Sequence, residues 1–559
     1  MYAPPSSTFL AMTVKDTKQK LFALITKHVV LRGEEGANIF YQGIRANWLF
    51  DFRTVLLSPS FLDAAADFFW DTFKDRYPFQ VGGLETAGIP LVAAIVMRGI
   101  ERGTPVRGFY IRKSRKPEGA QKIIEGELGD EPVILVDDLI NRGSSFIKQI
   151  DILKREGRKP IALFAFVRFR NIEDYAFAAR DDMEIVAPFA LQDFNLALGD
   201  AKKLADSDAF DVRWVTRSPH PAYFYRSSKS GPVLDAANVY VGSDDGVMHA
   251  YDQESGGEQW RFKILGFGSR GRTIFATPVL HDGMLYFGAY DGNFYALNAA
   301  TGKQQWIYMD ADWIHSSPAV APDLGIVFVG LQYGLWNKKG GVVALAAKTG
   351  KKQWEYADMP ASVRAAPAYS RTHGVVIVGS SDGTVYCFRA RTGELLWSYK
   401  TDGAIEGSFA FDEERGRVFF GGAGGLVHVV DVRNGHAVRV VPTGSGVGIW
   451  STPCVHGDHV YISSPDKRMY CFNLETLELV WTFVTDGRVF ASPIIANRLV
   501  YVGSNDGRLY ELDAHTGRNI AFFQTSERIT NAVAYNEKTK RFFVPTYANE
   551  LYCVERHER

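Results

Sequence analysis

Cysteine is scarce in this sequence, and long apolar runs are absent. Only four of the 559 residues are cysteine, and all four lie in the second half. This scarcity excludes a disulfide-stapled scaffold and predicts reduced thiols and a cytoplasmic location. No uninterrupted apolar run approaches the roughly 20 residues that a membrane helix needs. The amino-terminal segment also lacks a basic stretch followed by an apolar one, so we expect neither a membrane span nor a secretory signal.

Net charge is absent as well, because 63 Lys and Arg residues balance 63 Asp and Glu residues. This balance argues against a surface that binds nucleic acid or an anionic membrane along the whole chain. At about 100–200 residues per domain, the length predicts two or three domains. The chain indeed consists of two parts that have different sequence patterns.

The first part alternates between helical and strand patterns. Residues 61–73 have helical periodicity, whereas 132–138 and 161–169 are short apolar runs typical of buried parallel strands. Strands separated by helices predict an α/β fold with a parallel sheet. The helical pattern ends at about residue 205, so we expect one domain at 1–204 and a second at 205–559.

From residue 231 onward the chain repeats a unit of about 40–50 residues, the length of a four-stranded propeller blade. Each unit has an apolar strand, an Asp-Gly type turn, a second strand, a Thr-Gly type turn and a strand with a tryptophan. The tryptophans at this register are Trp260, Trp306, Trp354, Trp397 and Trp481. Two degenerate repeats have Arg439 and Ala521 in this slot.

Seven complete repeats precede an incomplete one, 531–559, which supplies three strands. We expect the missing outer strand to come from 210–217, where Trp214 fits the tryptophan slot. Pairing the two ends would close an eight-bladed propeller and remove exposed sheet edges. This part resembles the quinoprotein-like (PQQ-like) repeat propellers, a resemblance that implies the fold and says little about function.

The acidic turn residues and the cysteines of the repeats are interpreted as structural. Asp291, Asp382 and Asp506 precede glycine in tight hairpin turns, which require a positive φ. Three cysteines, Cys387, Cys471 and Cys553, share a strand slot that holds alanine in other repeats, which is typical of small buried packing positions. Cys454 lies in a different strand. Since quinoprotein dehydrogenases would carry a vicinal cysteine pair and a calcium-binding acidic set, we predict no bound quinone.

One loop position in each repeat carries a different side chain. It lies three residues before the proline of the first strand, or its equivalent, so it should fall at the same mouth of the ring in every blade. The residues there are Lys229, Phe275, His315, Arg364, Glu406, Trp450, Phe490 and Ile529. The candidates for binding a protein partner are Phe275, His315, Arg364, Trp450 and Phe490. Ordinary varied loop residues are the alternative interpretation.

The strongest chemical signal is the segment 133–146. An apolar strand runs into Asp137 and Asp138, and a Gly/Ser loop follows before an amphipathic helix. Such a turn directs backbone N–H groups and the positive end of the helix at an anion. The two carboxylates can accept hydrogen bonds from vicinal sugar hydroxyls. The segment therefore predicts a ribose 5-phosphate site, whose phosphate would contact Asn141, Arg142, Gly143, Ser144 and Ser145.

This segment resembles the phosphoribosyl-diphosphate (PRPP) motif of type I phosphoribosyltransferases. Further segments are similar to the orotate phosphoribosyltransferase branch. Residues 81–95 resemble its pyrophosphate-binding loop, 108–128 its mobile catalytic loop, and 47–53 its aromatic-aromatic-Asp-x-Arg stretch near the base. The resemblance covers most of residues 20–200 and implies a PRPP site and a nucleobase-like acceptor.

The resemblance also implies roles for individual residues. The catalytic residues of the mobile loop would be Lys116, Arg112 and Lys113. The pyrophosphate loop would contain Leu84, Glu85 and Thr86. The base would contact Tyr41, Phe50 and Arg168, with Arg170 as the alternative to the last. Mg²⁺ would be carried by PRPP without direct protein ligands, and with the basic side chains it would stabilise the leaving pyrophosphate.

Three departures from the family pattern stand out. Tyr41 replaces the base-contacting lysine, Pro117 a frequent histidine, and Asn141-Arg142 a pair of threonines. The leading hypothesis is a transferase acting on orotate or a related nitrogen heterocycle, with the propeller as a recognition or assembly module. The alternatives are a PRPP-binding sensor without transferase activity and a propeller scaffold with a vestigial first domain. The resemblance further implies a homodimer through the first domain, with Lys116 acting in the partner's site.

Overall fold

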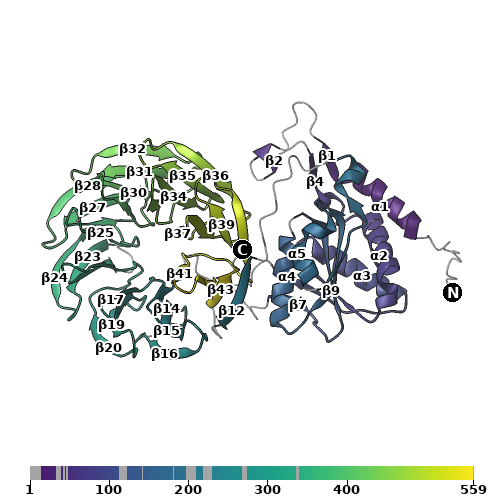
Figure 1. Cartoon of the computed structure of the whole chain (residues 1–559), viewed down its shortest axis with the longest axis horizontal. Coiled ribbons are helices and arrows are strands. Elements are labelled where there is room, and N and C mark those ends of the chain that lie inside the picture. Colours follow the sequence, from purple (N-terminus) through teal and green to yellow (C-terminus); the bar gives the residue numbers. More distant parts are fainter. Residues whose placement is uncertain are drawn as a thin grey trace. The chain divides into compact units, whose positions relative to one another are not determined.

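The computed structural model describes residues 14–32, 40–41, 44–45, 48–112, 123–141, 143–180, 182–196, 209–217, 230–266, 273–334 and 339–557. The chain divides into two compact units, Met1–Leu204 and Ala205–Arg559. Figure 1 shows the first as a sheet flanked by helices and the second as a ring of small sheets. No helix in the described ranges is long and apolar enough to cross a membrane.

A seven-stranded sheet forms the centre of the first unit. Its strand order is β10-β9-β8-β5-β6-β7, and β11 pairs with β9. The strands are β5 (Gln80–Leu84), β6 (Gly108–Ile111), β7 (Ile124–Gly126), β8 (Val133–Ile140), β9 (Pro160–Arg168), β10 (Glu184–Val186) and β11 (Phe189–Ala190). The α/β fold of the phosphoribosyltransferase type is confirmed. The expected parallel sheet needs one correction, because β7 returns beside β6 as an antiparallel edge strand.

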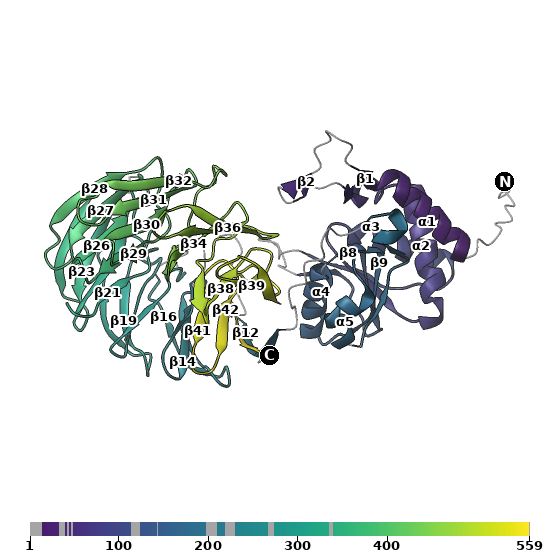
Figure 2. The ribbon, with the colours of Figure 1, turned by 45° about the horizontal axis from the view of Figure 1, so that its top comes forward.

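Helices cover both faces of this sheet (Figures 1 and 2). The helices are α1 (Val14–His28), α2 (Pro59–Phe73), α3 (Gly88–Glu101), α4 (Ser144–Arg155) and α5 (Ala176–Arg180). The side chains of β8 alternate between the two faces. Ile134 and Val136 join the core under α1, α2 and α3, whereas Val133 and Leu135 join the core under α4 and α5. This burial on both faces explains why the strand reads as a continuous apolar run.

Short elements complete the first unit. They are β1 (Val30–Arg32), β2 (Phe40–Tyr41), β3 (Ile44–Arg45), β4 (Trp48–Phe50), η1 (Phe52–Thr54), η2 (Lys74–Arg76), η3 (Ile172–Asp174) and η4 (Leu191–Phe194). Strand β1 pairs with β4, and β2 pairs with β3, both antiparallel.

The second unit is a ring of eight four-stranded antiparallel sheets, as predicted. The first blade is β13 (Val233–Leu234), β14 (Asn238–Gly242), β15 (Val247–Asp252) and β16 (Glu258–Lys263). The second is β17 (Val279–His281), β18 (Met284–Gly288), β19 (Phe294–Asn298) and β20 (Gln304–Tyr308). The third is β21 (Ala319–Ala321), β22 (Ile326–Tyr333), β23 (Lys339–Ala346) and β24 (Lys352–Met359). The fourth is β25 (Ala368–Ser370), β26 (Val375–Gly379), β27 (Thr384–Arg389) and β28 (Leu395–Lys400).

The remaining blades follow the same order. The fifth is β29 (Ala410–Asp412), β30 (Arg417–Gly421), β31 (Leu426–Asp431) and β32 (Ala437–Pro442). The sixth is β33 (Cys454–His456), β34 (His459–Ser464), β35 (Arg468–Asn473) and β36 (Leu479–Val484). The seventh is β37 (Ile494–Ala496), β38 (Leu499–Gly503), β39 (Arg508–Asp513) and β40 (Asn519–Gln524). The eighth joins β41 (Ala534–Asn536), β42 (Arg541–Pro545) and β43 (Glu550–Arg556) to β12 (Phe210–Arg217).

A tryptophan–glycine contact links neighbouring blades. Each outer-strand indole lies against a positive-φ glycine in the last turn of the next blade, and a Cβ on that glycine would be 2.6–2.7 Å from indole atoms. Each indole N–H also donates to a carbonyl near that turn at 2.8–3.1 Å. The pairs are Trp214–Gly256, Trp260–Gly302, Trp306–Gly350, Trp354–Gly393, Trp397–Gly435 and Trp481–Gly517. Glycine is required because a side chain would occupy the space of the indole.

The two repeats without this tryptophan have a structural explanation. In the fifth blade Arg439 replaces tryptophan, and the facing turn residue is Leu477 instead of glycine, with φ of 58°. The Arg439 guanidinium donates to the Thr476 carbonyl at 2.6 Å. In the seventh blade Ala521 fills the slot, because β43 and β12 of the next blade come from opposite ends of the second unit and no turn joins them.

Candidate functional site

The predicted PRPP-site residues meet at the carboxyl edge of the sheet in the first unit. Gly83 on β5 pairs with Val136 on β8, and Ile140 at the end of β8 pairs with Arg168 on β9. The loops that follow β5 and β8 therefore begin at adjacent places. In open α/β sheets ligands bind beyond this edge of the strands.

The acid pair lies in the last half of β8. Asp137 is buried, at 7% exposure, whereas Asp138 is half-buried. One oxygen of each carboxylate accepts a hydrogen bond from the next backbone N–H, Asp138 to Asp137 at 3.0 Å and Leu139 to Asp138 at 2.8 Å. These bonds orient both carboxylates at the strand end, and the more exposed Asp138 is the better placed to contact a sugar.

The loop after β8 turns sharply into α4 at Gly143. This residue has φ of 77°, and a Cβ there would lie 2.3 Å from the Phe177 ring, so only glycine fits. The buried Oδ1 of Asn141 has no hydrogen-bond partner in the described part of the chain. Ser145 is half-buried in the first turn of α4, whose backbone N–H groups are available to an anion. Arg142 lies outside the described residues, as does the side chain of Ser144.

Tyr175 supports this loop from beneath. Its hydroxyl donates to the Ile140 carbonyl at 3.0 Å, and burial raises the pKa of Tyr175 to about 12. The neutral hydroxyl therefore holds the end of β8 in place. Sequence reasoning missed Tyr175 and Phe177, because they come from a segment after β9 that carries no motif.

The predicted pyrophosphate loop joins β5 to α3. A Cβ on Gly83 would lie 2.8 Å from the Cα of Gly88, so the chain folds back on itself here only with glycine. The Leu84 side chain belongs to the core, Glu85 is half-buried, and Thr86 is exposed. Leu84 therefore contributes to the loop through its backbone, while Thr86 is accessible to a ligand.

Of the predicted catalytic residues, only Arg112 falls within the described residues. It follows β6, and its N–H donates to the Ile123 carbonyl at 2.8 Å. Its Nη1 lies 3.7 Å from Oε1 of Glu125 on β7. Lys113 and Lys116 lie outside the described residues.

The predicted base contacts are only partly accessible. Phe50 is buried at 6% exposure, with its ring 5.3 Å from that of Phe194. Trp48 is half-buried and packs edge-on against Phe169 at 5.6 Å, so it is the more accessible ring of this cluster. Arg168 is half-buried and donates to the Arg170 carbonyl at 2.8 Å. Tyr41 ends β2, and its side chain is outside the described part.

A further cation, Arg53, lies in η1 after β4. It binds Asp51 through two hydrogen bonds of 2.7 and 2.9 Å and is 82% exposed. These hydrogen bonds hold the pKa of Asp51 below its usual value. The same bonds to Asp51 raise the pKa of Arg53, with a smaller contribution from the Asp138 charge.

Six of the predicted mouth residues of the propeller lie in three pairs from neighbouring blades, and one of them, Phe275, is buried. The Phe275 and His315 ring centroids are 5.5 Å apart, Arg364 Nη1 lies 3.8 Å from Glu406 Oε2, and the Trp450 and Phe490 centroids are 5.2 Å apart. Ile529 is fully buried in the core, and Lys229 is outside the described ranges. Consecutive blades therefore contact one another through this position.

The acidic turn residues are structural, as predicted. Asp291 accepts a backbone N–H from Asn293 at 3.1 Å and the Tyr295 hydroxyl at 2.6 Å, so it closes its turn and fixes a core tyrosine. Asp382 and Asp506 accept the equivalent backbone bonds at 2.7 and 2.9 Å. Burial raises the pKa of the thiols of Cys387, Cys471 and Cys553 to about 12, so these thiols stay protonated.

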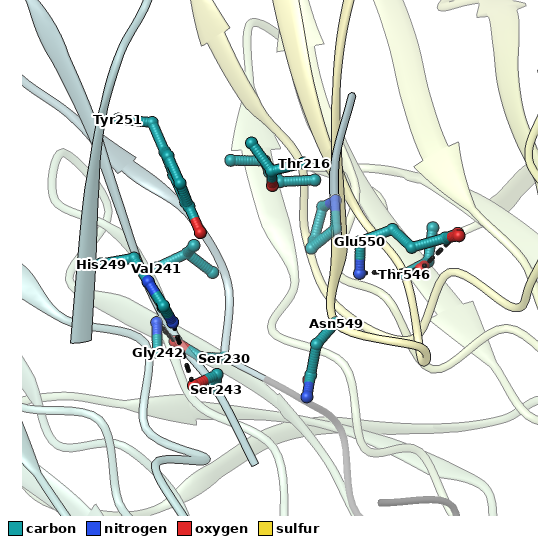
Figure 3. A pocket seen from close by; sticks show the side chains of 12 residues that line it. Thr216, Ser230, Val241, Gly242, Ser243, His249, Tyr251, Thr546, Asn549 and Glu550 are labelled. Carbon is teal, nitrogen blue, oxygen red and sulfur yellow. Dashed lines mark hydrogen bonds between the residues drawn. The ribbon is translucent and has the colours of Figure 1, made fainter. Parts of the chain in front are cut away.

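A small pocket lies where the eighth blade meets the first (Figure 3). Thr216 of β12 faces Val241, His249 and Tyr251 of the first blade across it. His249 Nε2 is 3.4 Å from the Ser243 hydroxyl. The pocket has a cavity volume of about 20 Å³, enough for about one water molecule. The pocket is therefore part of the blade interface and too small for a nucleotide or a peptide.

Comparisons with known proteins assign the two units separately. A family model described as outer membrane protein assembly factor BamB matches residues 211–362, 338–450 and 423–527. Orotate phosphoribosyltransferase of Bradyrhizobium sp. (strain ORS 278) is 27% identical over 173 residues, which are 30% of this chain and 92% of that protein. Its counterpart in Rhodopseudomonas palustris (strain TIE-1) is 28% identical over 142 residues, covering 24% of this chain and 76% of that protein.

Solved structures match the propeller fold. BamB from Moraxella catarrhalis is similar with a TM-score of 0.50 at 18% identity, over 63% of this chain and 99% of that one. Quinohemoprotein alcohol dehydrogenase from Comamonas testosteroni gives 0.53 at 15% identity, over 63% and 77% of the two chains. At these identities the similarity establishes the fold alone.

Proposed function

Because this chain belongs, through its propeller, to the family described as outer membrane protein assembly factor BamB, we propose that the chemistry resides in the first unit and that the propeller serves recognition or assembly. The proposed reaction is transfer of the phosphoribosyl group of PRPP to orotate or a related nitrogen heterocycle. The similarity of the first unit to orotate phosphoribosyltransferases supports it.

The acid pair and the loop after it carry the proposal. The Asp137 and Asp138 carboxylates stand at the carboxyl edge of the sheet, and Gly143 directs the chain into α4 directly beyond them. The carboxylates would accept the ribose hydroxyls, while the first turn of α4 would donate N–H groups to the 5-phosphate. The buried Asn141 amide oxygen, free of a partner among the described residues, is a further acceptor at this place.

The acid pair also has an electrostatic role in this reaction. The bond from ribose C1 to the pyrophosphate oxygen breaks, pyrophosphate leaves with the electron pair, and a ring nitrogen of the acceptor bonds to C1 while its proton passes to the leaving pyrophosphate or to water. Positive charge develops on the sugar in this step. Two fixed carboxylates close to the ribose favour that charge, because groups already oriented toward developing charge need no reorganisation.

The pyrophosphate would lie at the β5–α3 loop. Thr86 is exposed there, and the positively charged loop residues Arg112, Lys113 and Lys116 would neutralise the leaving group. Mg²⁺ would be carried by the phosphate oxygens of PRPP, which suit this ion, so the Asp137 and Asp138 carboxylates remain for the ribose hydroxyls. Bound to PRPP, Mg²⁺ would withdraw negative charge from the pyrophosphate.

The acceptor would pack against the aromatic side of the site. Trp48 is the accessible ring beside Phe50 and Phe169, and Arg168 supplies a cation at the end of β9. Tyr41 replaces the lysine of the resembled family, so a heterocycle less acidic than orotate would also be accommodated. We therefore propose a planar nitrogen heterocycle as the acceptor class.

Pyrophosphate release tests this function. The protein is incubated with PRPP, Mg²⁺ and a panel of heterocycles that includes orotate. Release that depends on one heterocycle supports the transferase, whereas no release with any of them contradicts it. Omitting Mg²⁺ should abolish release.

A PRPP-binding sensor is the second candidate. Two observations favour it: Tyr41 replaces the base-contacting lysine, and the Arg112 guanidinium lies near Glu125. Isothermal titration with PRPP and Mg²⁺ distinguishes the two candidates, since tight binding without release selects the sensor.

We further propose a homodimer through the first unit. Helix α3 exposes Ile89, Met97 and Ile100 along one stripe, at 36%, 59% and 59%. Apolar side chains at helical spacing on an exposed face favour burial against another surface. A second copy of the chain would cover this stripe and bring Lys116 to the neighbouring site.

A further inference from the structure

The mouth of the propeller has a polar centre that the proposed transfer reaction does not use. Arg364 is 41% exposed, and its guanidinium makes no hydrogen bond within the described ranges. Among the described residues it has one ion pair, with Glu406, at the long separation of 3.8 Å. Because a guanidinium has five N–H donors, this side chain retains most of its capacity to bind an anion.

Among the titratable groups of this centre, Arg364 is the cation available to bind an anion. Burial, together with the Arg364 charge, lowers the pKa of His315 to about 4, so His315 is neutral. Its buried Nε2 has no hydrogen-bond partner in the described chain. Burial raises the pKa of Glu406, and its carboxylate approaches the Arg364 guanidinium only to 3.8 Å. A carboxylate that reaches both guanidinium nitrogens would therefore bind better than Glu406 does.

Aromatic groups flank this centre on both sides. Toward the second blade, the half-buried rings of Tyr290 and Trp313 stack at 6.0 Å, and the buried Phe275 ring lies 5.3 Å from Tyr290. Toward the seventh blade, Trp450 is 44% exposed and lies against Phe490. An exposed tryptophan on one flank and a set of packed rings on the other are typical anchors for apolar side chains.

We propose that this mouth binds an extended peptide segment in which an acidic residue stands between apolar residues. The carboxylate would bind Arg364, and the apolar side chains would pack on the two aromatic flanks. One aromatic flank belongs to the second and third blades and the other to the sixth and seventh, with Arg364 between them in the fourth. An extended peptide can contact all three places, so it fits better than a compact small molecule. This site is independent of the proposed phosphoribosyl transfer.

A peptide array with the full-length protein tests the chemistry. It carries nine-residue peptides with apolar residues around a central Asp, Glu, Asn or Lys. We expect binding to peptides with central Asp or Glu and at least tenfold weaker binding to the Asn counterparts, because a hydrogen bond to a charged group is lost. Equal binding of acidic and neutral peptides, or binding of none, would overturn the proposal.

Fluorescence polarisation with the best acidic peptide then tests the residues. Arg364→Ala should weaken binding about tenfold or more, and Trp450→Ala should also weaken it. Two matched controls should stay within about twofold: Arg371→Ala, an 80% exposed arginine, and Leu479→Ala, a 52% exposed apolar residue. Equal effects of test and control variants would contradict the assignment.

Glu406→Gln covers the case in which Arg364→Ala does not fold. It removes the competing carboxylate while keeping its shape, so peptide binding should tighten. Unchanged or weaker binding would count against Arg364 as the anion site. Pyrroloquinoline quinone, an aromatic carboxylate, is titrated in parallel. If it binds saturably and displaces the peptide, or binds while no peptide binds, the mouth is a small-molecule site and the proposal is overturned.

Discussion

Asp137 and Asp138 differ in exposure, and this difference predicts unequal effects of substitution. Asp138→Asn should lower the rate of pyrophosphate release about 10- to 150-fold, because one charge-assisted contact to ribose is worth roughly 1.5–3 kcal/mol. Asp137→Asn should have a smaller effect, since Asp137 is the more buried of the two. Steady-state kinetics with PRPP measure both, and thermal unfolding should remain unchanged.

Asp130→Asn is the matched control, because Asp130 is an exposed acid paired with Arg158 on the surface. Its kinetics should equal those of the unmodified protein. Near-normal kinetics of the Asp137→Asn/Asp138→Asn double variant would remove the acid pair from the site.

Gly143 is predicted to tolerate no side chain. Gly143→Ala would place a Cβ in the left-handed region, at roughly 1–2 kcal/mol, and against the Phe177 ring, which adds about 1–3 kcal/mol for overpacking. We expect a lower urea midpoint for the first unit and weaker PRPP binding by titration.

Gly157→Ala separates these two causes. Gly157 also has a positive φ, 71°, but a Cβ there would meet nothing within 4 Å. It should therefore show the conformational cost alone and leave PRPP binding intact. An equal loss of stability in both variants would mean that the contact with Phe177 is unimportant.

Between neighbouring blades, the Arg439 and Leu477 pair can be converted into the contact found elsewhere in the ring. Arg439→Trp alone should not stabilise, because the Leu477 side chain occupies the position of the indole. Leu477→Gly alone should destabilise, because a buried side chain is lost. Together they should recreate the tryptophan–glycine contact, with a favourable coupling of about 0.5–3 kcal/mol in urea unfolding. Strict additivity would contradict this account of the blade contact.

Ring closure depends on a strand from the other end of the propeller sequence. Strand β12 pairs with β43 along its length, from Phe210 with Arg556 to Arg217 with Glu550. A chain that starts at about residue 205 should therefore fold as a stable monomer. One that starts at about residue 225 would expose the edge of β43 and should aggregate. Light scattering of both chains after expression makes the comparison, and identical behaviour would mean that closure does not require β12.

Subunit complementation tests the proposed dimer. Lys116→Ala and Asp138→Asn should each strongly reduce activity, because each removes a group needed at the same site. If Lys116 acts in the neighbouring subunit, mixed dimers contain one complete site and activity should partly return. Mixed dimers that form without regaining activity would place Lys116 in its own subunit's site.

The Met97→Glu variant tests the interface itself. It places a charge in the apolar stripe of α3, so the sedimentation coefficient should shift toward that of a monomer.

Much of the architecture followed from local sequence pattern. The period of the tryptophans predicted eight blades, because each blade repeats the same contact with the next. The Asp-Gly pairs predicted tight turns, since the positive φ at the glycine is a local requirement. The run from 133 to 146 marked the acid pair, because strand, loop and helix follow one another without interruption.

The features that the sequence did not predict depend on contacts between distant segments. Nothing local distinguishes the core position of Phe50 from the accessible position of Trp48, because both belong to one short strand and their burial depends on Phe169 and Phe194. The support of the motif loop by Tyr175 and Phe177 arises from packing across the sheet, and so does the need for glycine at position 143. The replacement of tryptophan by Ala521 is a further example. Only the pairing of β12 with β43, which no turn joins, explains why this blade needs no tryptophan. Local pattern thus predicted the elements and the candidate site residues, whereas packing between remote segments decides which of those side chains are exposed and which are buried.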